Sequence, residues 1–211
     1  PANTTGDKNT AIGHQALGAN TTADDNTAVG YNSLVLNTTG AENIAVGYQS
    51  LDSNTTGTEN VGIGVNALGA NTTGGDNVAI GKSSLFANTT TGSHTAVGYR
   101  SMQCNTSGDA NTAVGKCSLF TNTTGCYNVT VGVNSLKLLT TGCCNVAVGK
   151  DAGENTTTGT NNHSFGFAAC ASSATVSNEI TLGNGSNDNL RCADTSISSL
   201  SDLRDKTNVE D

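Results

Sequence analysis

The cysteines and histidines of this chain are the side chains best suited to redox, general-base or metal chemistry. The three histidines, His14, His94 and His163, occupy three different places in the repeating pattern described below. No catalytic constellation and no pocket-forming insertion is visible, so we expect no enzyme and no cofactor. All seven cysteines lie in the second half of the chain: Cys104, Cys117, Cys126, Cys143, Cys144, Cys170 and Cys192.

Two of these cysteines are separated by one repeat. Cys126 and Cys143 are 17 residues apart, which predicts that they lie near disulfide range on adjacent units. An odd cysteine count without a framework spacing indicates reduced thiols and cytoplasmic assembly, and a disulfide between these two is the alternative. A metal site at Cys143 and Cys144 is disfavoured because histidines and paired CxxC ligands are absent nearby.

A glycine that recurs every 17 residues organises the chain. Short fixed periods of this kind are typical of β-helices and related solenoids. Seventeen residues are too few for a helical hairpin, so each unit is predicted to be one coil of an all-β solenoid. The glycines are Gly13, Gly30, Gly47, Gly64, Gly81, Gly98, Gly115, Gly132, Gly149 and Gly166, with Gly183 in the same phase.

Three further positions of the coil have a restricted composition. The residue before the glycine is β-branched or aromatic, as Ile80 is, and the residue before that is small, as Ala79 is. Four residues after the glycine comes a leucine or methionine, as at Leu85, preceded by Ser or Ala. Because strand side chains alternate between faces, we expect two short strands per coil. Each would have an inward aliphatic residue and an outward small residue where another chain approaches closely.

The rest of the coil has turn chemistry. Stretches such as Asn37-Thr38-Thr39-Gly40 favour turns, because Asn and Thr can bond to nearby backbone and Gly supplies left-handed conformations. The Asn-x-Thr sequons are interpreted as these turns rather than as glycosylation sites. A second asparagine position is predicted to form an amide ladder along the stack: Asn9, Asn26, Asn43, Asn60 and Asn77. His94 interrupts it, which we interpret as a tolerated polar substitution rather than a ligand.

The thin coil predicts an oligomer. Each coil buries few aliphatic residues, so further burial is needed, and an obligate parallel homotrimer is the simplest solution. The net charge of the chain is −8. A trimer would carry three times this charge, which disfavours nucleic acid and anionic membranes as partners. No transmembrane run or signal peptide is present. Because the chain opens within a repeat, without a cap, we expect it to be a piece of a longer protein.

Two stretches resemble known families. Units such as Asn26–Leu34 with the following Asn-Thr-Thr-Gly resemble the head repeats of trimeric autotransporter adhesins and of phage tail fibres, over residues 1 to about 166. The segments 180–184, 190–192 and 199–206 resemble the junction before the endosialidase-type intramolecular chaperone of viral tail spikes. The resemblance implies a left-handed parallel β-roll or β-helix and a structural shaft of a viral fibre used in host attachment. The fibre would belong to the virion, and its partner would be a cell-surface glycan or protein. A bacterial surface adhesin and an ice-binding solenoid are the alternatives.

The second resemblance also implies self-cleavage of a precursor. In that family a Ser-Asp junction is cut by a serine and a lysine five residues later, and Ser201, Asp202 and Lys206 match this pattern. A serine needs an adjacent base, which a desolvated lysine can be. Because the chaperone body would follow Asp211, we expect cleavage only in a longer precursor. The expected domains are a solenoid shaft (1–167), a diverged β transition segment (168–200) and the start of the chaperone (201–211).

Overall fold

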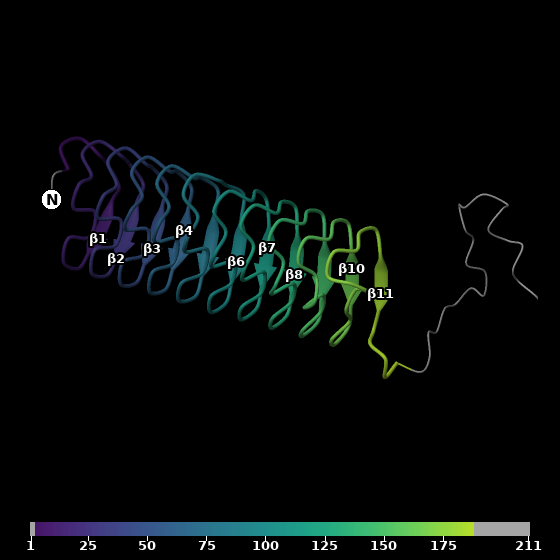
Figure 1. Cartoon of the computed structure of the whole chain (residues 1–211). Helices are drawn as coiled ribbons and strands as arrows, with labels where there is room; N and C mark the ends of the chain where they lie inside the picture. The colour runs from purple at the N-terminus through teal and green to yellow at the C-terminus, as the bar shows by residue number, and fades with distance from the viewer. Residues whose placement is uncertain (1–2, 188–211) are drawn as a thin grey trace, which may run out of the picture.

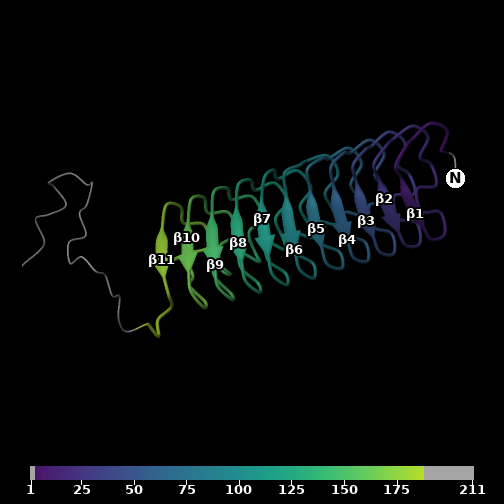
Figure 2. The same ribbon diagram turned by 180° about the vertical axis from the view of Figure 1, so that it is seen from behind.

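The computed structural model describes residues 3–187, which form a β-solenoid with one short strand per coil (Figure 1). The coils are stacked along one axis, from β1 at the N-terminal end to β11 at the other end (Figures 1 and 2). The strands are β1 (Thr10–Ile12), β2 (Thr27–Val29), β3 (Ile44–Val46), β4 (Val61–Ile63), β5 (Val78–Ile80), β6 (Thr95–Val97), β7 (Thr112–Val114), β8 (Val129–Val131), β9 (Val146–Val148), β10 (His163–Phe165) and β11 (Ile180–Leu182).

All eleven strands belong to one parallel sheet in which each strand pairs with the next along the chain. The register advances by one repeat per strand, so Val78 is paired with Thr95 and Ile80 with Val97. This architecture confirms the all-β solenoid of 17-residue coils. Within residues 3–187 there is no helix long and apolar enough to cross a membrane.

The second predicted strand is wrong, because the leucine position lies in a turn. Leu85 has a φ of 49° and Leu34 one of 50°, in the left-handed region that non-glycine residues seldom adopt. That conformation costs about 1–2 kcal/mol per residue. Both side chains are nevertheless fully buried in the coil interior, which returns about 1.5–3 kcal/mol each. The narrow coil must turn sharply at this point while still directing a large side chain inward.

The predicted orientation of the strand residues is also wrong. Ala79 is 0% exposed and faces the interior, whereas Ile80 is 37% exposed and faces outward. The reason is the width of the coil. A Cβ added at Gly62, the equivalent of Ala79 in the preceding coil, would lie 2.7 Å from the Ser50 hydroxyl oxygen and 3.2 Å from a methyl carbon of Leu51. The small residues therefore fill the interior of one chain and do not form an exposed close-packing face.

The repeating glycine that follows the strand makes the corner of the coil. Gly30 has a φ of 140°, and a Cβ there would collide with the carbonyl oxygen of Gly47 on the next coil. The glycine of the Asn-Thr-Thr-Gly turn has a different reason for its presence. Gly40 is not left-handed, but a Cβ there would collide with the carbonyl oxygen of Gly57. Close stacking of backbones, not an unusual φ, favours glycine at this position in most coils.

Candidate interaction surface

An amide ladder along the solenoid fixes the register of the strands. The Asn43 Oδ1 accepts hydrogen bonds from the backbone N–H of Asn60 (3.1 Å) and from its Nδ2 (3.1 Å). The Nδ2 of Asn43 also donates to the carbonyl oxygen of Gly57 at 2.9 Å. The pattern repeats between Asn60 and Asn77, and these side chains are fully buried. The predicted ladder is confirmed. Its hydrogen bonds join equivalent residues of adjacent coils and so fix the register between successive strands.

A second ladder, which the sequence analysis missed, runs through the turn asparagines. Asn54 Nδ2 donates to Asn37 Oδ1 at 2.9 Å and, within its own turn, to the carbonyl oxygen of Gly57 at 3.0 Å. Asn71 repeats the arrangement with Asn54 at 2.9 Å. These asparagines are buried, so attachment of a glycan to their amides is incompatible with the folded coil. Their recurrence at 17 residues is the sequence signal for this second ladder.

His94 replaces one asparagine of the first ladder. Its Nδ1 accepts the backbone N–H of Asn111 at 3.1 Å, where an asparagine Oδ1 accepts in other coils. Its Nε2 lies 3.1 Å from the hydroxyl of Thr91, which stands where most coils have the turn glycine. The ring is 1% exposed, and burial lowers the pKa of His94, opposed by the negative charge of Asp109. The neutral ring thus preserves the backbone part of the ladder, and the exchange of side-chain amides stops there.

The outward side of the sheet presents an apolar surface along the whole solenoid. We define the outer sheet face as the side chains at the first and third residues of each strand. The third residue is apolar in every strand: Ile12, Val29, Val46, Ile63, Ile80, Val97, Val114, Val131, Val148, Phe165 and Leu182. The first residue is Thr, Val, Ile or His163. These side chains are half-buried or exposed, and none of them carries a carboxylate or an amine. With ten steps of about 4.8 Å, the face is roughly 50 Å long.

A second outward row adjoins this face across the corner glycine. The ring of Tyr31 stacks between His14 and Tyr48, with centroids 5.1 and 5.3 Å away and the planes nearly parallel. Further along, the Lys150 ammonium lies 5.2 Å from the centroid of the Phe167 ring. The ring faces are therefore largely engaged by neighbouring coils. The row is of mixed character, because Lys82, Lys116 and Lys150 occupy the same position in other coils.

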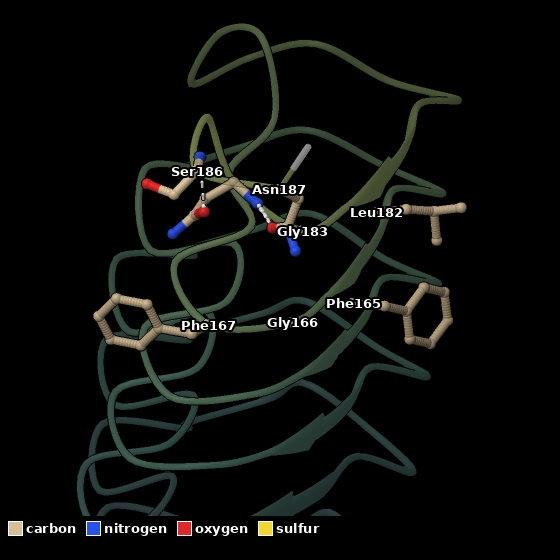
Figure 3. Close-up of a pocket in the computed structure, with 8 residues that line it drawn as sticks. Phe165, Gly166, Phe167, Leu182, Gly183, Ser186 and Asn187 are labelled. Atoms are coloured by element: carbon tan, nitrogen blue, oxygen red, sulfur yellow. Dashed lines mark hydrogen bonds between the residues drawn. The ribbon is translucent and has the colours of Figure 1, made fainter. Parts of the chain in front are cut away.

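The last described coil contains a hollow, lined by Phe165, Phe167, Leu182 and the turn 183–187 (Figure 3). In Figure 3, Phe165 and Leu182 point to the same side, outward from the sheet, and Phe167 points the other way. Asn187 Oδ1 accepts the backbone N–H of Asn184 at 2.7 Å and closes the turn. The lining contains no titratable side chain, so the hollow offers apolar contact and backbone polarity but no acid-base chemistry.

The residues proposed for self-cleavage, Ser201, Asp202 and Lys206, lie outside the described residues. Among residues 3–187 no three His, Cys, Asp or Glu side chains are grouped closely enough to hold a metal ion. Cys126 and Cys143 do lie on adjacent coils as predicted, and both are free thiols in the structure. Searches against protein-family models, curated proteins and solved structures found no match for this chain.

Proposed function

We propose that this chain is a non-catalytic shaft segment of a homotrimeric fibre, in which three solenoids pack in parallel through their outer sheet faces. The observation that carries the proposal is the uninterrupted apolar row along that face. Monomeric soluble proteins rarely expose contiguous apolar patches larger than a few hundred Å². Covering the row with another chain would remove valine, isoleucine and leucine side chains from water at about 25 cal/mol per Å².

A second copy of the same chain is the occupant that this row fits best. Its side chains repeat with the rise of one coil, so a partner must present apolar groups at the same interval. A parallel copy does so at every level. Charge does not oppose self-association through this face, because the carboxylates of one acidic row (Asp25, Glu42, Glu59 and Asp76) lie in the turns before the strands and not on the outer sheet face.

The resemblance of the repeats to tail-fibre and adhesin heads supports the assignment to a host-attachment fibre. Within that proposal the fibre belongs to a virion, with a bacterial surface adhesin as the alternative, and its receptor is a cell-surface glycan or protein. Ice binding is less well supported. The first threonine of each turn pair uses its hydroxyl within the protein, as in the 3.0 Å bond from Thr38 to the Thr55 carbonyl.

Sedimentation equilibrium of the full chain tests the trimer. We expect three times the chain mass of 21.1 kDa, and a folded species of one chain mass at micromolar concentration would contradict the proposal. Ile63→Lys with Ile80→Lys places charges on the outer sheet face and should abolish the trimer. Thr56→Lys with Thr73→Lys is the matched control, since these exposed threonines lie on the same two coils but in turns, and it should stay trimeric.

The proposal extends to a precursor that continues past Asp211 and cuts itself at Ser201. Ten similar coils can pair out of register by whole repeats, and near-degenerate states fold poorly, so a C-terminal nucleus that aligns three chains has a physical purpose. Mass spectrometry of the extended precursor should show cleavage at the Ser201-Asp202 junction. Ser201→Ala and Lys206→Ala should remain uncut but trimeric. Cleavage that persists in the Lys206 variant would remove Lys206 from the mechanism.

A further inference from the structure

We propose that Cys126 and Cys143 are a redox site, at which a disulfide forms between two consecutive coils when the chain meets a low-molecular-weight disulfide. This inference does not rest on the fibre function. It rests on the stacking of one side-chain position along the solenoid and on the placement of the two thiols within it.

The position that contains both cysteines forms a column of side-chain acceptors. Each member accepts a hydrogen bond from the backbone N–H of the residue one coil earlier. The Cys143 Sγ accepts from Cys126 N–H at 3.1 Å, and the Cys126 Sγ accepts from Asp109 N–H at 3.3 Å. Thr160 and Ser177 continue the column with their hydroxyl oxygens. The Cys143 sulfur is therefore already directed at the backbone of Cys126.

The backbones on which these thiols sit are held at disulfide distance. The N–H of Cys144 donates to the carbonyl oxygen of Cys126 at 3.0 Å. Three residues further along, β8 and β9 are paired, with Val129 opposite Val146. In-register coils place equivalent Cα atoms about 4.8 Å apart, within the range of about 4.4–6.8 Å that disulfides require. Rotation of the Cys126 side chain about χ1, away from Asp109, would turn its sulfur toward that of Cys143. The two Cβ atoms, also about 4.8 Å apart in stacked coils, then need only a small approach of the coils to reach the Cβ–Cβ distance of about 3.5–4.5 Å that a disulfide has.

The pairing is specific to these two cysteines. No other cysteine of the chain has a second one 17 residues away. Cys144 is exposed and has Tyr127 and Asn161 as its equivalents on the adjacent coils. Both Cys126 and Cys143 are partly exposed, so a small disulfide can reach them in the folded protein.

The reaction is two successive thiol–disulfide exchanges. The thiolate of one cysteine attacks a sulfur of the small disulfide, forms a mixed disulfide and releases one small thiolate. The thiolate of the other cysteine then attacks the protein sulfur of that mixed disulfide, forms the Cys126–Cys143 bond and releases the second small thiolate. Two protein thiols are oxidised, one small disulfide is reduced to two thiols, and the two cysteine protons go to the departing thiolates.

The disulfide would join equivalent positions of two adjacent coils and so oppose a shift in their register. It closes a loop of one repeat and restrains the unfolded chain, so the oxidised protein should melt at a higher temperature than the reduced protein. Dithiothreitol should reverse the change. A fibre that leaves a reducing compartment would thereby gain a covalent bond that fixes the register of these two coils.

Peptide mapping of the folded full chain after incubation with oxidised glutathione tests the site. Trypsin cuts after Lys116, Lys137 and Lys150 and so separates the two cysteines into residues 117–137 and 138–150. We expect these peptides to be cross-linked in the wild type, in Cys117→Ser and in Cys144→Ser. The link should be lost in Cys126→Ser and Cys143→Ser, whose hydroxyls can still accept the column's N–H bonds. Glutathione adducts without the cross-link, or a cross-link that persists in Cys143→Ser, would overturn the proposal.

Discussion

The hydroxyl of Ser50 donates a 2.8 Å hydrogen bond to the carbonyl oxygen of Gly62, straight across the interior of one coil. The same bond joins Ser33 to Ala45 at 2.8 Å and recurs further along the solenoid. It satisfies a buried hydroxyl and brings the turn close to the strand. The remaining space is filled by a leucine side chain from the turn, such as Leu51, which is fully buried. The interior of most coils therefore holds one large aliphatic side chain, and Leu139 adds a second beside Leu136 where it replaces a turn asparagine.

Ala79→Leu should destabilise the fold by about 1–3 kcal/mol per chain, since overpacking of a filled core forces rotamer and backbone shifts. Ala79 is buried against the turn, whereas its neighbour Ile80 faces outward. Ile80→Leu is therefore the matched control and should change the free energy of unfolding little. Denaturant titration of both variants decides between the observed orientation and the opposite one, in which the effects would be reversed.

Leu85→Ala should lower the folding stability of each chain, whereas Val97→Ala should weaken the association of chains. Leu85 is 0% exposed, so its truncation leaves a cavity and should cost about 2–5 kcal/mol. Val97 belongs to the outer sheet face, so its truncation should weaken association of chains and leave the folding of a single solenoid nearly unchanged. Thermal melts at several protein concentrations separate the two effects. Lys82→Ala, at an exposed position, is the control for both, and equal melting of all three variants would refute this assignment.

Asn60→Ala should destabilise the solenoid through the amide ladder. The Asn60 Oδ1 accepts from both the N–H and the Nδ2 of Asn77, at 3.2 and 3.0 Å, and a buried donor left without a partner costs about 1–3 kcal/mol. Loss of the Asn60 Nδ2 also removes one of the two hydrogen bonds to the carbonyl oxygen of Gly74, which keeps the bond from Asn71 Nδ2. Glu59→Ala, at the exposed neighbouring position, should have little effect. Hydrogen exchange should show faster exchange at the Asn77 amide; unchanged protection there would contradict the role of the ladder.

The stability of the wild type should fall as pH decreases below 6.5 because of His94. Its Nδ1 accepts the Asn111 N–H, so a proton on that nitrogen would set two donors against each other. Burial lowers its pKa in the folded state below the ordinary value of 6.5, while Asp109 acts in the opposite direction. The unfolded chain therefore binds this proton first. The contribution of the neutral His94 ring to stability is fully present above pH 6.5. It is lost below that pH, by at most about 1.4 kcal/mol per pH unit.

The variant His94→Asn restores the ladder and should remove this part of the pH dependence. His14→Asn is the control, since His14 is exposed, and should keep the wild-type profile. Denaturant titrations between pH 5 and 8 provide the comparison. A profile for His94→Asn that matches the wild type would mean that other groups cause the acid sensitivity.

The features of this structure that depend on period and local chemistry can be predicted from the sequence. The glycine spacing predicted a stacked β-solenoid and its register, because residues one repeat apart must coincide when coils stack. It also predicted the ladder of Asn43 and Asn60, and the juxtaposition of Cys126 with Cys143. Each of these follows from translation along one axis and needs no knowledge of the shape of the coil.

Which side chains lie inside each coil depends on the three-dimensional shape of the coil and does not follow from the repeat. Strand alternation places Ala79 and Ile80 on opposite faces, but it does not say which face is internal. That choice depends on the distance between the strand and the opposite turn, which the Ser50–Gly62 bond and the buried leucines determine together. The same narrowness places Leu85 at a left-handed corner instead of in a second strand, because a chain that must reverse within a few residues cannot stay extended. The aliphatic row is consequently left on the outside, where it becomes available to another chain.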